Sequence, residues 1–218
     1  MTFIPPLGPG RFPSPSPIAP QRDGRLLFEE WAQAELLEQR TVVLRGPLDD
    51  VTAGNVATQL MFLDGAGDEE IRLRIDSAGG SLTAAASLID VIDELGVPVE
   101  ALATRAEGPA VAVLAVCDVR AATPHATLRM HEPDVNFDGP AATLVAHLDH
   151  YKGAVAALWV RVSAACRLTP EHVAQEFAAG RYLSPADAQA FGLIDEIATP
   201  PAEVRRLRRP MGFRPPEQ

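Results

Sequence analysis

The chain has 218 residues, a net charge of −10 and ordinary proportions of apolar (47%) and charged (22%) residues. This composition excludes a fibrous or wholly disordered protein, and the negative charge disfavours nucleic acid and anionic lipid as partners. The sequence has no run of 18 apolar residues, and its start lacks a basic stretch followed by an apolar core. We therefore expect no membrane span and no secretory signal. Two cysteines cannot build a disulfide framework, which favours the reducing cytoplasm.

Proline divides the chain into three parts. It is concentrated near both ends, and the last residues also carry five arginines against two glutamates. We expect a Pro-rich flexible segment at 1–25, one folded domain at 26–199 and an Arg/Pro-rich tail at 200–218.

Apolar spacing in the folded part predicts helices and strands that alternate. Thr169 is the expected N-cap of the last predicted helix, at 170–179. A strand, helix, strand order requires parallel pairing with right-handed crossovers, so the predicted fold class is α/β. In chain order we expect a helix at 28–39, a strand at 41–44, a helix at 51–63, a strand at 71–75, a helix at 82–95, a strand at 97–104, a helix at 109–117, a strand at 127–130, and helices at 141–167 and 170–179.

A glycine turn, Ile75-Asp-Ser-Ala-Gly-Gly-Ser81, joins a predicted strand to a predicted helix. Gly79 and Gly80 permit backbone torsions closed to other residues, so amide N–H groups can point outward beside the positive end of the helix. Such a nest can hold a phosphate, a carboxylate or an oxyanion. A Gly-Gly turn is also a plain tight connection, and the turn alone does not separate the two interpretations.

Five segments in sequence carry a family resemblance, at 42–50, 59–63, 74–84, 130–133 and 182–195. Over residues 26–197 the chain resembles ClpP, the proteolytic subunit of the ATP-dependent Clp protease. The resemblance implies a crotonase/ClpP-like core of stacked βαβ units with a protruding helical handle at about 134–168. It also implies homo- or hetero-oligomeric rings of ClpP-type subunits, an AAA+ unfoldase of ClpX or ClpC type as partner, and no cofactor.

The family's nucleophile is the serine of a Gly-x-Ala-Ser-Met-Gly-Ala segment, and the matching residues 104–112 contain no serine. Matching the helix that follows places Pro109 at the nucleophile position, and a shift of one residue would place Gly108 or Ala110 there. Proline offers no hydroxyl, thiol or amine for a base to activate.

The resemblance assigns two further triad positions. His131 corresponds to the general base, and Glu176 to the aspartate that orients it. A glutamate can hold an imidazole in the right tautomer, since triads with glutamate exist on other folds. Each residue also has a structural interpretation: His131 as a histidine held by hydrogen bonds at a strand end, and Glu176 as a surface carboxylate.

Backbone N–H groups of Gly79 or Gly80 and of Ala110 would form the oxyanion hole, because they match the family's glycine and the residue after its nucleophile. Backbone donors survive side-chain changes, so we expect the hole to persist.

Other nucleophiles near the glycine turn are few. Ser77, Ser81 and Thr104 are the nearby hydroxyls, and Cys117 lies about two helical turns beyond Pro109. We expect Cys117 to be buried, and a buried cysteine is usually inert.

A metal site is not expected. His147 and His150 share one side of a predicted helix with Asp149 between them in sequence. They lack the third and fourth ligands that a zinc site requires.

Together these observations predict a ClpP-like pseudoenzyme, a subunit of a Clp-type ring without peptidase activity and with a structural or regulatory role. One alternative is an active serine-type endopeptidase subunit with an unconventional nucleophile. Another is an acyl-CoA-binding protein that uses the crotonase-type core.

Overall fold

A computed structural model describes residues 24–133, 135 and 139–198. The segments predicted as a Pro-rich start and an Arg/Pro-rich tail therefore lie outside the described residues, apart from positions 24 and 25. The chain divides into two units, residues 1–35 and 36–218. Helix α1 (Gly24–Glu38) begins in the first unit and ends in the second.

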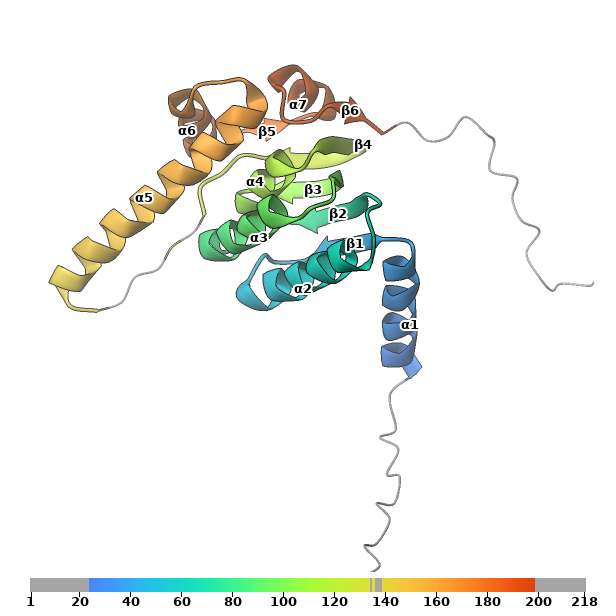
Figure 1. Ribbon diagram of the computed structural model, residues 1–218. Coiled ribbons are helices and arrows are strands. Elements are labelled where there is room, and N and C mark those ends of the chain that lie inside the picture. Colours follow the sequence, from blue (N-terminus) through green and yellow to red (C-terminus); the bar gives the residue numbers. More distant parts are fainter. Residues whose placement is uncertain (1–23, 134, 136–138, 199–218) are drawn as a thin grey trace, which may run out of the picture. The chain divides into compact units, whose positions relative to one another are not determined.

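Six strands form one sheet within the described part of the second unit (Figure 1). The first four strands pair in parallel in sequence order. The fifth is antiparallel to the fourth, and the sixth is parallel to it. The parallel-dominated sheet confirms the predicted α/β class. The strands are β1 (Thr41–Arg45), β2 (Ile71–Ser77), β3 (Val99–Glu107), β4 (Val119–Arg129), β5 (Tyr182–Leu183) and β6 (Glu196–Ile197).

Three helices follow the first three strands and lie over one face of the sheet (Figure 1). They are α2 (Asp50–Ala66), α3 (Leu82–Glu94) and α4 (Pro109–Val116). All but the last residue of α4 are buried, because this helix is apolar on every side and lies in the centre of the core. The expected helices at these positions are confirmed within a few residues.

The longest helix, α5 (Ala141–Cys166), extends away from the sheet (Figure 1). Its C-terminal half carries the buried residues Leu158, Trp159 and Val162, whereas residues 145–150 are exposed. The Trp159 ring lies 3.9 Å, between centroids, from Phe177 of α6 (Pro170–Ala178). A projecting helix is thus present where the handle is expected. No helix in the described part of the chain has both the length and the apolar character needed to cross a membrane.

Some elements differ from the sequence-based expectation. Strand β4 begins at Val119 rather than at residue 127, and its alternation is interrupted around Pro124. Three short elements after α6 were not expected: β5, α7 (Pro185–Phe191) and β6. Thr169 caps α6 as predicted, because its hydroxyl accepts a hydrogen bond from the His172 N–H at 3.3 Å.

Arg40 fastens the loop between α2 and β2. Its guanidinium donates hydrogen bonds to the carbonyl oxygens of Leu63 (3.0 Å), Gly67 (3.2 Å), Glu69 (2.6 Å) and Glu70 (3.2 Å). These four carbonyls belong to the end of a helix and the turn that follows, where intrahelical donors are missing. One side chain therefore satisfies the backbone that leads into β2.

Replacement of Arg40 by alanine is expected to lower the free energy of unfolding by about 2 kcal/mol, because charge-assisted hydrogen bonds to several carbonyls are lost together. The midpoint of urea unfolding measures this loss. Arg72→Ala is the matched control, since Arg72 pairs with Glu70 and Glu100 on the exposed surface and should contribute about 0.5 kcal/mol or less. If both variants lowered the free energy of unfolding equally and only slightly, the stabilising role of Arg40 would be contradicted.

Candidate functional site

The glycine turn lies between the segment that follows β1 and the end of β3. The Leu48 N–H donates to Gly79 O at 2.9 Å, and the Ser81 N–H donates to Leu48 O at 2.7 Å. A Cβ on Gly80 would collide with Leu48 O, and one on Gly79 would lie 2.7 Å from Glu107 O. The turn comes this close to Leu48, after β1, and to Glu107, at the end of β3. Only glycine, which has no side chain, allows such an approach of the backbones.

The two glycine amides have different partners. The Gly79 N–H donates to the Ser77 hydroxyl at 3.2 Å, and both residues are buried. Gly80 is exposed, and none of the residues that the structure describes accepts a hydrogen bond from its N–H. Of the two predicted donors, Gly80 is therefore the one available to a ligand.

A sharp turn connects β3 to α4 beside these glycines. Gly108 has φ 51° and ψ −126°, and Pro109 is the first residue of α4. Pro109 and Ala110 are both buried. The Pro109 Cδ lies 3.3 Å from the position that a Cβ on Gly79 would take. The predicted donor Ala110 has no acceptor for its N–H among the described residues.

His131 lies against Gly108. A Cβ placed on Gly108 would be 2.9 Å from both Cε1 and Nε2 of the His131 ring. On the other side of the ring, Nδ1 is 2.8 Å from the Glu132 carbonyl oxygen. Because a carbonyl can only accept, Nδ1 carries the hydrogen, and in the neutral imidazole Nε2 keeps its lone pair. The ring edge with Cε1 and Nε2 thus fills the space beside a residue that has no side chain.

Glu176 is engaged elsewhere. Its Oε1 accepts a hydrogen bond from Arg181 Nη1 at 2.8 Å and lies 3.3 Å from His172 Nε2. The neighbouring backbone is near His131, since the Met130 N–H donates to Arg181 O at 2.9 Å. In the described part of the chain, however, no hydrogen bond joins Glu176 to His131. The structure brings together the glycine turn, residues 108–110 and His131, and ties Glu176 to Arg181 and His172 instead.

The alternative nucleophiles all have structural roles. Ser77 accepts from Gly79, Ser81 caps α3 by accepting from the Ala84 N–H at 3.2 Å, and the Thr104 hydroxyl donates to Ile75 O at 3.2 Å. Cys117 is 5% exposed, as expected, and burial raises the pKa of its thiol to about 12. A thiol with this pKa is almost entirely protonated at neutral pH, which removes the nucleophilic form.

Metal-ligating side chains do not gather in the described part of the chain. No group of three or more histidine, cysteine, aspartate or glutamate side chains there is arranged to hold an ion. His147 and His150, the pair noted in the sequence, both lie on the exposed half of α5.

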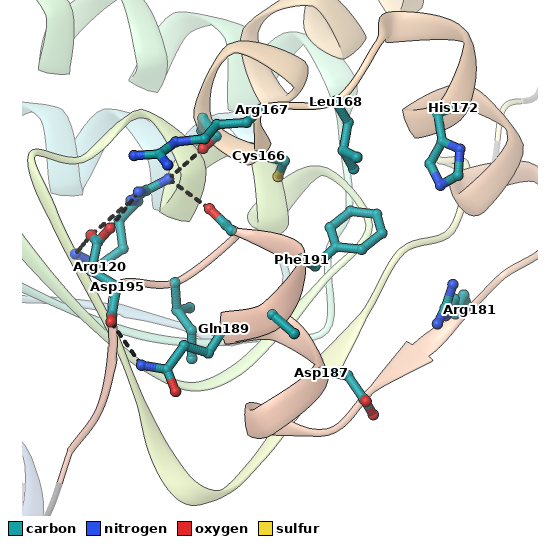
Figure 2. A pocket seen from close by; sticks show the side chains of 14 residues that line it. Arg120, Cys166, Arg167, Leu168, His172, Arg181, Asp187, Gln189, Phe191 and Asp195 are labelled. Carbon is teal, nitrogen blue, oxygen red and sulfur yellow. Dashed lines mark hydrogen bonds and ion pairs between the residues drawn. The ribbon is translucent and has the colours of Figure 1, made fainter.

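A separate cavity of about 720 Å³ lies at the ends of α5, α6 and α7 (Figure 2). Gly79, Gly108 and His131 are not among its lining residues. Arg120 in its lining binds the Asp195 carboxylate through Nη2 (2.5 Å) and Nε (3.0 Å). Its Nη1 donates to the carbonyl oxygens of Ala165 and Gly192. The Arg120 guanidinium therefore connects β4 to the ends of α5 and α7, and its hydrogen bonds are made within the protein.

Comparison with known proteins gives consistent matches. A family model described as Clp protease matches residues 29–201. The chain is 32% identical over 179 residues to a putative ATP-dependent Clp protease proteolytic subunit-like protein of Streptomyces coelicolor, covering 78% of this chain and 85% of that protein. It is 29% identical over 174 residues to ATP-dependent Clp protease proteolytic subunit 1 of Nocardia farcinica, covering 77% and 87%.

The Arg120 pair predicts an acid-sensitive contribution to stability. Hydrogen bonds from Arg120 lower the pKa of Asp195, so the folded state favours the ionised carboxylate. This contribution is complete above the ordinary aspartate pKa of about 4 and is lost as the pH falls through the lowered value. Asp195→Asn should cost about 1 kcal/mol at neutral pH, since the carboxylate is partly exposed, and the difference from the unmodified chain should shrink below about pH 4.

Urea unfolding at several pH values measures this difference. Asp93→Asn serves as the control at neutral pH, because Asp93 binds Arg161 with both side chains more than 40% exposed and is expected to contribute about 0.5 kcal/mol. An Asp195→Asn effect that stays constant down to about pH 3 would argue against the pair as its source.

Proposed function

The chain belongs to the Clp protease family, and we propose that it acts there as a ring subunit without peptidase activity of its own. The observation that carries this proposal is the contact between His131 and Gly108. The edge of the imidazole that carries Nε2 fills the space that a side chain on Gly108 would take, and residues 104–112 contain neither serine nor cysteine.

Serine-type peptide cleavage needs an oxygen that gives its proton to the base as it attacks the carbonyl. His131 has an oriented lone pair, but the residues beside it offer no hydroxyl to deprotonate. Removing the nucleophile of a triad costs on the order of 10⁶ in turnover. Donors that remain around an oxyanion leave about 10³ over water, which is far below the activity of a protease.

A place in a mixed ring is the role we propose for such a subunit. The family resemblance implies rings of ClpP-type subunits fed by an AAA+ unfoldase, and the chain has the same α/β core with a projecting helix. Val145 and Leu148 on the projecting half of α5, and Val160 nearer its end, expose 61%, 41% and 54% of their surface. Apolar surface of this kind is suited to contacts between subunits.

The alternative functions have weaker support. An unconventional nucleophile would have to come from hydroxyls that already bind the backbone or from a buried Cys117. An acyl thioester carbonyl would need two polarising amides, whereas the Gly79 N–H is already bound to Ser77.

Labelling with a fluorophosphonate probe tests the absence of peptidase activity. The purified full chain is expected to gain no probe mass and to cleave model peptides at the rate of buffer alone. A Clp proteolytic subunit that has the catalytic serine provides the positive control in the same reaction. Probe attached anywhere in residues 104–118 would refute the proposal.

Mixed assembly is tested separately. The chain, co-expressed with a serine-bearing Clp subunit from its own cell and recovered through a tag on that subunit, should appear with it in one ring. Native mass spectrometry should then show ring masses that contain both chains. Recovery of the tagged ring without this chain, at matched expression, would contradict the mixed ring.

A further inference from the structure

We infer that Gly108, rather than Pro109, occupies the nucleophile position, and that Pro109 removes a second catalytic group, one N–H of the oxyanion hole. This inference rests on the proposed function, because it treats the site as that of a serine peptidase without its nucleophile. It moves the assignment one residue from the position that sequence matching favours.

The backbone supports the assignment of Gly108. The residue lies on a sharp connection between β3 and α4, with φ 51° and ψ −126°. Serine nucleophiles of hydrolases are held on strained strand-to-helix turns of this kind, which project the side chain away from the core. A Cβ on Gly108 would lie 2.9 Å from both Cε1 and Nε2 of His131, which is closer than such atoms normally approach, so the imidazole occupies the space of a side chain at this position. A serine there requires the imidazole to shift away slightly, and its hydroxyl would then lie beside Nε2 of the base.

The missing donor of the oxyanion hole is explained by the residue that follows the nucleophile position. At such a turn its backbone N–H, at the start of the helix, is one of the two donors to the oxyanion. Here that residue is Pro109, whose nitrogen carries Cδ in place of a hydrogen. The Cδ faces the glycine turn, 3.3 Å from the site of a Cβ on Gly79. A methylene group thus stands where a donor would be, and the Gly80 N–H is left as the one donor of the pair.

The two losses are chemically independent. A serine at position 108 would restore the nucleophile, and a residue with an N–H at position 109 would restore the second donor. In attack on a fluorophosphonate, the serine proton passes to His131 Nε2, the bond from oxygen to phosphorus forms, and fluoride leaves with the electrons of its bond to phosphorus. Negative charge on the phosphoryl oxygen then faces the hole, so the second donor should raise the rate.

The experiment compares the labelling rates of Gly108→Ser, the double variant Gly108→Ser/Pro109→Ala, and the controls Gly108→Ala, Pro109→Ala and Pro109→Ser. Rates come from intact-protein mass spectra with the full-length chain. The controls should remain unlabelled. Gly108→Ser should label slowly, and the double variant should label faster by about 10² to 10³, the effect of one oxyanion donor. Adding His131→Ala to the double variant should abolish its labelling.

Each other outcome overturns a distinct part. Equal rates for the single and double serine variants would show that Pro109 removes no donor. Labelling of Pro109→Ser, which keeps Gly108 and its turn, would return the nucleophile position to residue 109. Unlabelled serine variants that melt at the temperature of Gly108→Ala would reject the assignment of Gly108. Labelling of the unmodified chain would instead reject the proposed function.

Discussion

The close approach of the backbone at Gly79 and Gly80 is the constraint on which the site depends. Neither position has room for a Cβ, because the carbonyls of Glu107 and Leu48 occupy that space. The turn therefore joins the exits of β1, β2 and β3 at one edge of the sheet, where open α/β folds place their ligands. That edge also contains the start of α4 and the contact between Gly108 and His131, so a side chain on either glycine would separate the elements that form the site.

The Glu132 carbonyl fixes the orientation of the His131 imidazole. A triad carboxylate fixes the imidazole tautomer, and here the Glu132 carbonyl holds Nδ1 at 2.8 Å and does the same. Glu176 is thereby free to serve a structural purpose, and Arg181 and His172 bind its Oε1. The backbone of the next residue therefore orients His131, while Glu176, which the resemblance assigns to the orienting position, stabilises the connection between α6 and β5.

The sequence predicts the layers of this fold better than its site. Alternating apolar runs indicate the parallel β1 to β4 and their helices, but β5 and β6 are two residues long and too short for periodicity to reveal. The sequence shows that a serine is missing from 104–112, yet only the torsions of Gly108 and its distance from His131 distinguish residue 108 from residue 109. For Glu176 a signal was present: His172 precedes it by four residues, the spacing of an ion pair on one helix face.

Gly108 and Pro109, the two residues that under the proposed function remove catalytic groups, also suit the local backbone. A residue with a Cβ in a sparsely populated conformation such as that of Gly108 costs about 1 to 3 kcal/mol, and glycine avoids this cost. Proline at the first position of α4 has a φ already set for a helix and forgoes an N–H that no intrahelical carbonyl would accept. Strain at an active site is tolerated because catalysis requires it. Where catalysis is not required, the same turn is more stable as Gly-Pro, so the proposed loss of peptidase activity and a more stable turn would have one structural origin.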